Sequence, residues 1–510
     1  QRQEDATRKT FKEMKYLKVN LWGKEIGRLA WDAATRRTYF VYNSREKDSI
    51  PDIVPLLSPK THRNMLLPIL GDDRPIYQGL PPFIADSLPD SWGNTLFDRW
   101  VKENKIPRNK VTPLYKLMFI GSRGMGALEY EPAASELTHP HDVDITKLYD
   151  LSLKILEERG DAKLTHNEGL TLQSLLAVGT SAGGRQMKAI IAINTVTGEI
   201  CSGQIDGLDG FEYYILKFGD TQMPTAEIET AYFDMARNAG IDMEECRLFT
   251  VEGVNHFLTH RFDRVGGKKI YVQTLAAINP EARSYEDFVN TCRELSLLES
   301  DIEQLYRRMV FNVMTNNTDD HSKNFSFVLE DNCWRLAPAY DVTFIFNVNG
   351  TGPNIERRLS IGGKISEITK SDLLEFADRN DIRNAQTIID EVAASIRRFD
   401  EYADKNNLSQ PWRGLIQKTL SDNLTAFDYD AGVYDTEDEF VDSFGRVIRD
   451  VVLSVNSKRH YEISAIIDGN HRRRFIRPNM PIYEEMTSLD IYQLTLETKR
   501  RLIEMLLPEE

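Results

Sequence analysis

Two carboxylates and one amide in the second half of the chain have the types and the spacing that phosphoryl transfer requires. Asp319 and Asn324 lie five positions apart, and Asp341 follows after a short segment. Phosphoryl transfer needs a carboxylate that accepts the proton of the attacking hydroxyl, with oxygen ligands for magnesium nearby. The D-x-x-x-x-N spacing is the one that kinase catalytic loops use. The pattern therefore favours an ATP-dependent phosphotransferase that also needs Mg²⁺.

The elements that would hold these side chains can be predicted from hydrophobic periodicity. Apolar residues recur at helical spacing over 302–314, and this predicted helix leads directly to the Asp319 segment. Apolar stretches at 325–329 and 333–336 flank a turn-forming sequence, which is typical of a hairpin. We expect the hairpin to deliver Asp341 to the same site.

A glycine-rich segment is the second candidate element. Gly179-Thr-Ser-Ala-Gly-Gly-Arg-Gln-Met187 follows the apolar run 175–178 and precedes the alternating stretch 188–194, so a strand is expected on each side. A Walker A loop or a dinucleotide-binding fingerprint would open a helix instead. The strand–loop–strand order resembles the hairpin that covers the phosphates of ATP in kinases, although the G-x-G-x-x-G pattern is absent. A plain hairpin loop is the alternative.

Lys217 lies inside the predicted apolar strand 213–218. A buried lysine is costly unless it is paired, and kinases pair theirs with ATP phosphates and a helix glutamate. Glu229, at the start of the next predicted helix, is the natural partner; an edge-strand lysine that faces solvent is the alternative. Another apolar strand is expected at 249–257, and the residues after it fall where a kinase hinge would contact adenine.

Composition limits the classes of function. The chain has 510 residues, 41% of them hydrophobic, with a formal net charge of -15 and a pI of about 5.3. This acidic field disfavours direct binding of nucleic acid. The four cysteines are scattered singly, without a C-x-x-C pair, as expected for reduced thiols in the cytoplasm. The sequence has no apolar run near eighteen residues, so no membrane span is expected.

Changes in residue pattern divide the chain into five expected segments. Alternating residues and Gly- and Pro-rich turns near the N-terminus favour strands, whereas the character is helical from about Tyr285, and the C-terminal tail is helical in composition. The expected segments are a short tail (1–14), a β-rich subdomain (15–135), a unit with the glycine loop (136–262), a helical unit with the catalytic loop (263–427) and a C-terminal extension (428–510).

Together these motifs resemble the HipA family of toxin kinases, from bacterial type II toxin–antitoxin modules. The resemblance spans roughly residues 15–425, and the T-D-x-H-x-K-N stretch is its most specific part. The hinge departs from familiar members, which have an acidic residue where His260 stands. The segments that carry the resemblance are Val178–Lys188, His260–Arg264, Asn317–Ser326 and Leu336–Asp341, with looser matches at Ser87–Gly93, Gly124–Leu128 and Leu359–Lys364.

The resemblance implies an α+β, protein-kinase-like fold of two lobes, with a β-rich subdomain ahead of the N-lobe and an all-helical C-lobe. It implies that Asp319 is the catalytic base, that Asn324 and Asp341 bind Mg²⁺, and that Lys217 is catalytic. It also implies autophosphorylation of Ser181, with Thr180 as a neighbouring acceptor. The residues expected to line the ATP site are Gly183, Gly184, Arg185, Gln186, Met187, Lys188, Lys217, His260, Arg261, Phe262, His321, Ser322, Lys323, Asn324, Tyr340 and Asp341.

The family's usual partner is a HipB-like helix-turn-helix antitoxin that binds operator DNA, so DNA association is expected only through that partner. Known substrates are host proteins, including aminoacyl-tRNA synthetases, whose phosphorylation arrests growth. Three alternatives stay open: a small-molecule kinase, a catalytically silent scaffold that co-represses transcription with an antitoxin, and a metal-dependent phosphohydrolase that uses Asp319, Asp320 and His321. The basic cluster 471–475 matches nothing in the family.

Overall fold

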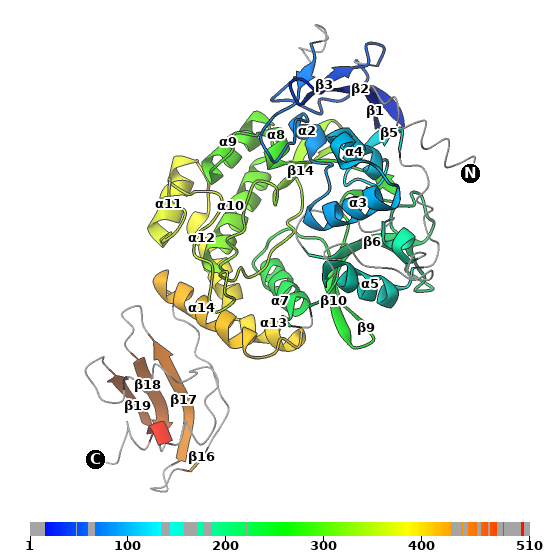
Figure 1. Cartoon of the computed structure of the whole chain (residues 1–510). Coiled ribbons are helices and arrows are strands. Elements are labelled where there is room, and N and C mark those ends of the chain that lie inside the picture. Colours follow the sequence, from blue (N-terminus) through cyan, green and yellow to red (C-terminus); the bar gives the residue numbers. More distant parts are fainter. Residues whose placement is uncertain are drawn as a thin grey trace.

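The structure is a computed structural model that describes residues 16–46, 48–59, 67–133, 143–157, 171–176, 186–220, 222–429, 440–441, 447–455, 461–467, 470–476, 483 and 501–503. Within these ranges the chain is a mixed α/β protein built from antiparallel sheets and helices (Figure 1). Among the helices of these ranges, none combines the length and the apolar composition that crossing a membrane requires.

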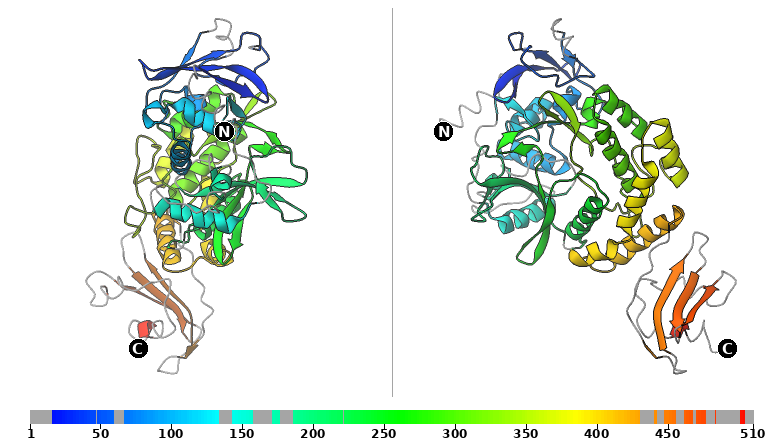
Figure 2. Two further views of the ribbon diagram at one scale, coloured as in Figure 1. Left: turned by 45° about the vertical axis from the view of Figure 1, so that its right-hand side comes forward. Right: turned by 180° about the vertical axis from the view of Figure 1, so that it is seen from behind.

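The first sheet has five strands in the order β4-β3-β2-β1-β5. Leu17, Val19 and Phe40 are fully buried, because alternate residues of a strand point to the same face. Figures 1 and 2 show α3 and α4 between this sheet and the second one. The elements are β1 (Tyr16–Leu21), β2 (Lys24–Asp32), β3 (Arg37–Tyr42), β4 (Ile69–Leu70), β5 (Leu128–Glu131), α2 (Pro82–Ala85), α3 (Ser91–Glu103), the 3₁₀ helix η2 (Arg108–Lys110) and α4 (Pro113–Ile120).

The second sheet has five strands in the order β7-β6-β8-β10-β9, and it carries Lys188 and Lys217. Helix α7 connects two of its strands in the sequence and packs against β9 and β10. The elements are α5 (Ile145–Glu157), β6 (Lys188–Asn194), β7 (Ile200–Ser202), β8 (Phe211–Lys217), α7 (Thr225–Asn238), β9 (Cys246–Val251) and β10 (Val254–His260).

Two sequence predictions in this region are corrected. Residues 171–176 are helical, so the strand predicted before the glycine loop is wrong for Leu175 and Leu176. A short apolar run fits a buried helix as well as a strand. The single strand expected at 249–257 is a hairpin of β9 and β10, with Glu252 and Gly253 at positive φ in its turn.

The third sheet has three strands in the order β13-β14-β15, and it contacts α8 and α10. It contains the predicted hairpin, since β14 pairs with β15. The expectation of an all-helical unit over 263–427 is wrong, because β13 extends the hairpin and β11 pairs with β12. The elements are β11 (Arg264–Val265), β12 (Lys268–Lys269), β13 (Tyr271–Thr274), α8 (Leu275–Ile278), α9 (Tyr285–Glu294), α10 (Glu299–Met314), β14 (Ser326–Glu330), β15 (Cys333–Leu336), α11 (Lys370–Arg379), α12 (Ala385–Ile396), α13 (Phe399–Lys405) and α14 (Trp412–Ala426).

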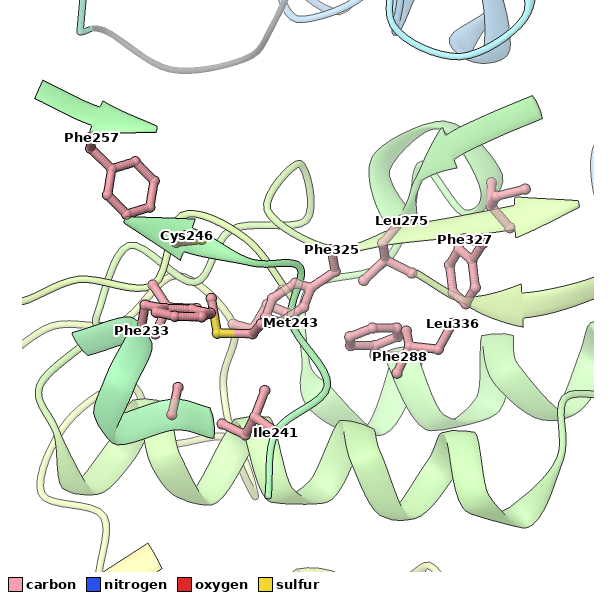
Figure 3. Close-up of a cluster of buried hydrophobic side chains, with 14 of the residues drawn as sticks. Phe233, Ile241, Met243, Cys246, Phe257, Leu275, Phe288, Phe325, Phe327 and Leu336 are labelled. Carbon is pink, nitrogen blue, oxygen red and sulfur yellow. The ribbon is translucent and has the colours of Figure 1, made fainter. Parts of the chain in front are cut away.

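One hydrophobic cluster joins the second and third sheets. Helix α10 is buried along most of its length, and Phe288 of α9 packs on Phe325 with ring centroids 4.9 Å apart. This packing fixes the helix and the hairpin between which Asp319 and Asn324 lie. Figure 3 shows the cluster, with Phe233, Ile241, Met243, Cys246, Phe257, Leu275, Phe288, Phe325, Phe327 and Leu336 labelled.

The C-terminal residues form a separate four-stranded sheet, β16-β17-β18-β19, drawn in orange in Figures 1 and 2. The prediction that this tail is helical is wrong over the described strands. Alternation decides the outcome, because Ile463, Ala465 and Ile467 are buried on one face of β18. The strands are β16 (Phe440–Val441), β17 (Val447–Val455), β18 (Tyr461–Ile467) and β19 (Asn470–Ile476), which contains the basic cluster.

Candidate active site

A buried ion-pair network lies where the second sheet, α7 and the segment after β15 meet. Lys217 is the last residue of β8, Glu229 lies on α7, and Asp341 follows the hairpin. The Lys217 ammonium donates hydrogen bonds to the carboxylates of both Glu229 and Asp341. The pairing of Lys217 with Glu229 that the sequence suggested is therefore present, and Asp341 joins it from 124 residues further along the chain.

Opposite charges within this network favour the charged forms of Lys217 and Asp341. Burial by itself would lower the pKa of Lys217, but the carboxylates of Asp341 and Glu229 raise it above its usual value. Burial would likewise raise the pKa of Asp341, yet the charges of Lys217 and Lys188 hold it below its usual range. Burial does raise the pKa of Glu229, with Lys217 opposing it. Asp341 is thus the more acidic of the two carboxylates.

Lys188, the first residue of β6, lies directly opposite Lys217 in the strand register. Its side chain is 1% exposed, and its ammonium is 2.7 Å from the carboxylate of Asp90. The indole nitrogen of Trp92 donates to the Lys188 carbonyl oxygen at 3.1 Å. The start of α3 therefore contacts the second sheet beside the ion-pair network.

The catalytic-loop candidate begins where α10 ends. Asn324 donates from its amide nitrogen to the carbonyl oxygen of Asp319 at 2.8 Å, which closes the loop. The Asp319 side chain is 44% exposed. His321 and Arg358 flank its carboxylate, with nitrogen–oxygen distances of 3.9 and 3.6 Å. Asp319 can therefore be reached by a substrate from outside.

The neighbouring carboxylate has a different environment. Asp320 is fully buried and accepts hydrogen bonds from the Tyr285 hydroxyl (2.8 Å), the Arg357 guanidinium (3.0 Å) and the Arg358 backbone N–H (2.8 Å). Burial raises the pKa of Asp320, and the charge of Arg357 opposes this shift. With three donors around it, Asp320 holds the loop in place, whereas the Asp319 carboxylate stays exposed.

A cavity of about 20 Å³ lies between these groups, and Asp319, Asn324 and Asp341 all line it. This volume suits one water molecule or a small cation. Mg²⁺ binds through one or two carboxylates, with water and phosphate oxygens completing its shell. The hydrogen bond to Asp319 uses the amide nitrogen of Asn324, so the amide oxygen is the atom that can bind a cation. The buried Asn317 side-chain oxygen, in the same cavity, has no hydrogen-bond partner among the described residues. These residues fit a magnesium ion.

The expected hinge residues differ in what they can contact. The Arg261 guanidinium is fully buried and donates twice to Asp263 at 2.8 Å, and its backbone N–H donates to the Tyr213 carbonyl at 2.9 Å. Phe262 stacks on Tyr340 with ring centroids 5.9 Å apart. The hydrogen bond that the His260 ring makes to the Glu244 carboxylate raises the pKa of His260, and burial opposes this shift.

The remaining expected ATP-site residues are placed as follows. Gln186 donates from its side chain to the Phe218 carbonyl at 2.9 Å, and Met187 accepts from the Phe218 N–H at 2.9 Å. The Lys323 carbonyl accepts from the Tyr340 hydroxyl at 2.8 Å, and the Ser322 carbonyl accepts from the Ala276 N–H at 3.0 Å. Residues Thr180, Ser181, Gly183, Gly184 and Arg185 lie outside the described residues.

Sequence reasoning missed two of the site's neighbours. Asp90 belongs to the Ser87–Gly93 segment, a looser match to the HipA family that gave Asp90 itself no role, and Arg358 lies in a segment without periodicity. Neither position carries a pattern that predicts its contact, because both contacts depend on how distant segments pack.

Comparisons with known proteins show to which family the chain belongs. Two family models match in succession: the HipA N-terminal domain over residues 17–131 and the HipA-like C-terminal domain over residues 180–399. The chain belongs to the HipA family.

Individual relatives are distant. The protein Y4dM of Sinorhizobium fredii is 22% identical over 435 residues, which cover 79% of this chain and 95% of that protein. Y4mE of the same organism is 23% identical over 351 residues, which cover 63% of this chain and 79% of that protein. Both are named as candidate kinases. The solved structure of HipA with HipB and operator DNA from Shewanella oneidensis MR-1 has a TM-score of 0.55 and 14% identity, covering 80% of this chain and 96% of that one. At this identity the similarity shows the fold.

Proposed function

We propose that this chain is an ATP- and magnesium-dependent serine/threonine protein kinase with two kinase-like lobes. The observation that carries the proposal is the contact of Lys217 with both Glu229 and Asp341. Asp341 lines one cavity together with Asp319 and Asn324. This combination supplies a cation for phosphates, oxygen ligands for a metal and a reachable base, which are the parts that phosphoryl transfer needs.

The residues would divide the chemistry as follows. Lys217 and Lys188 bind the phosphates of ATP, and the Phe262 and Tyr340 rings lie beside the nucleotide. Asn324 and Asp341 would hold Mg²⁺, which neutralises charge on the phosphates when it is bound. Asp319 accepts the proton of the attacking serine or threonine hydroxyl. Its 44% exposure suits a hydroxyl presented by another protein.

Membership of the HipA family supports a wider proposal. The chain would be the toxin of a type II toxin–antitoxin module in the cytoplasm, and a HipB-like antitoxin would be its partner, with DNA bound only through that partner. The Shewanella HipA was solved with HipB and operator DNA. Its substrate would be a host protein such as an aminoacyl-tRNA synthetase, and Ser181 or Thr180 would be autophosphorylated.

The alternatives predict different environments for the same residues. A phosphohydrolase that uses Asp319, Asp320 and His321 would need Asp320 as a metal ligand, but three protein donors already surround that carboxylate. A silent scaffold would not require the buried Lys217 network. A small-molecule kinase would share the catalytic residues, so only the phosphorylated product distinguishes it from a protein kinase.

The test of the proposal is phosphoryl transfer by charge-removing variants. Asp319→Asn removes the proton acceptor and Asp341→Asn removes a metal ligand's charge, so each should lower transfer at least about a hundredfold. Glu375→Gln is the matched control, since Glu375 is an exposed carboxylate that pairs with Arg379 on α11. Near-normal transfer by both Asp variants would refute the assignment of the site.

A further inference from the structure

The start of α3 contacts the edge of the proposed nucleotide site, although α3 belongs to the N-terminal part of the chain, which also forms the first sheet. Asp90 precedes α3 as its N-cap, and Trp92 lies in the first turn. Together they contact Lys188 on both its side chain and its backbone, at 2.7 and 3.1 Å. Asp90 is 8% exposed and Lys188 is 1% exposed, so the ion pair is shielded from water.

The Asp90–Lys188 ion pair offsets the repulsion between two neighbouring buried ammonium groups. Lys188 and Lys217 are register partners on adjacent antiparallel strands, and like charges directly opposite each other destabilise a sheet. Both ammonium groups are also buried, where charges need partners. Lys217 has Glu229 and Asp341, and Asp90 supplies a carboxylate to Lys188.

We propose that Asp90 is a positioning residue of the nucleotide site. It fixes the position of the Lys188 ammonium beside Lys217, at the side of the network where the phosphates of ATP are proposed to bind. The segment that carries Asp90 and Trp92 would then be a required part of the ATP site. The inference rests on the proposed kinase function and assigns a role within the same site.

The two carboxylate oxygens of Asp90 have different partners, so its role as a helix cap and its role as a partner of Lys188 can be tested separately. One oxygen accepts from the Gly93 N–H at 2.5 Å and caps α3, and the other binds Lys188. Asn is a preferred N-cap residue, so Asp90→Asn keeps the cap while it removes the charge. Glu is not among the preferred caps, so Asp90→Glu keeps the charge and weakens the cap.

The experiment is titration calorimetry of the full chain with ATP and Mg²⁺, accompanied by thermal denaturation of each variant. Asp90→Asn should raise the Kd for ATP at least roughly tenfold, which corresponds to about 1.4 kcal/mol. Asp90→Glu should stay within roughly threefold of the wild type, even if its melting midpoint falls. A purely structural cap would give the reverse order, because Asn preserves it and Glu does not.

Three further variants complete the test. Glu129→Gln removes another ion pair of the N-terminal part of the chain, 2.7 Å from Lys269 and away from the network, and should leave the Kd unchanged. Lys188→Met should weaken ATP binding, and adding Asp90→Asn to it should weaken binding little further. Unchanged or tighter ATP binding by Asp90→Asn, while Lys188→Met is impaired, would overturn the role of Asp90 alone. A wild-type chain that does not bind ATP would overturn the proposed function as well.

Discussion

Replacing Lys217 with Met should destabilise the protein in a way that depends on pH. Lys217 is 11% exposed and lies between two carboxylates, Glu229 at 7% and Asp341 at 24% exposure. Removing one partner from a buried ion pair costs about 3–5 kcal/mol. Because Asp341 is partly exposed, we expect about 3 kcal/mol near neutral pH. For a unit of 150–250 residues this corresponds to a fall in melting midpoint of roughly 6–12 °C.

The sign of the pH dependence follows from the pKa shifts. In the wild type the folded-state pKa of Asp341 is lowered, so its contribution to stability is present at neutral pH and is lost as the pH falls. Without Lys217, burial raises the pKa of both carboxylates, and such groups lose stability as the pH rises through their folded-state pKa. The gap in melting midpoint between wild type and Lys217→Met should therefore be small near pH 4 and widen toward pH 7.

The assay is thermal denaturation followed by tryptophan fluorescence between pH 4.5 and 8. Lys269→Met is the matched control, because Lys269 also binds two carboxylates, Glu129 at 2.7 Å and the more exposed Asp206 at 3.1 Å. It should show a smaller loss with little pH dependence. Adding Glu229→Gln to Lys217→Met should restore part of the midpoint. A loss in Lys217→Met that is equal at all pH values, or greater at pH 4.5, would refute the reasoning.

Three further outcomes are expected. Asp320→Asn should lower the free energy of unfolding by about 3 kcal/mol because it leaves Arg357 without a buried carboxylate; an unchanged urea midpoint would contradict this. After incubation with ATP and Mg²⁺, mass spectrometry should find phosphate on Ser181 or Thr180, and Ser181→Asp should weaken ATP binding by charge repulsion. Unmodified Ser181 and Thr180, or undiminished ATP affinity of Ser181→Asp, would contradict self-inactivation by autophosphorylation. Expression without an antitoxin should arrest growth, whereas Asp319→Asn should not; equal growth curves would count against toxicity through phosphorylation.

Contacts between sequence neighbours could be predicted from the sequence. Lys217 and Glu229 are 12 residues apart, at the end of a strand and on the next helix, and the cost of an unpaired buried lysine suggested their contact. Asp319 and Asn324 were identified by spacing, and the hairpin that leads to Asp341 by its turn residues. In each case a local pattern carried the information.

Contacts between distant segments could not be predicted in this way. Asp90 and Lys188 are 98 residues apart, the first at the start of α3 and the second at the start of β6. Nothing in the sequence around either residue specifies that the two side chains meet. Trp92 and Arg358 likewise reach their partners only through the packing of whole units. The sequence placed Lys188 only among the expected ATP-site residues, and its contact with Asp90 depends on tertiary structure.

Short apolar runs account for the mistaken elements. Leu175 and Leu176 lie in a helix. The prediction of a strand there was wrong because an apolar run of this length carries no period that separates a helix from a strand. The tail was expected to be helical from its composition, yet the alternation of Ile463, Ala465 and Ile467 is a strand pattern that outweighs composition. Periodicity over a full element was the more reliable guide.

The most direct test of the kinase proposal is to follow the γ-phosphate of labelled ATP. The wild-type chain is incubated with Mg²⁺ and a bacterial lysate, beside Asp319→Asn as the inactive control, and the labelled products are separated. We predict a labelled protein that contains phosphoserine or phosphothreonine and is absent with Asp319→Asn. Label that appears only as inorganic phosphate or on a small molecule, or no transfer at all, would contradict the proposal that this member of the HipA family is a protein kinase.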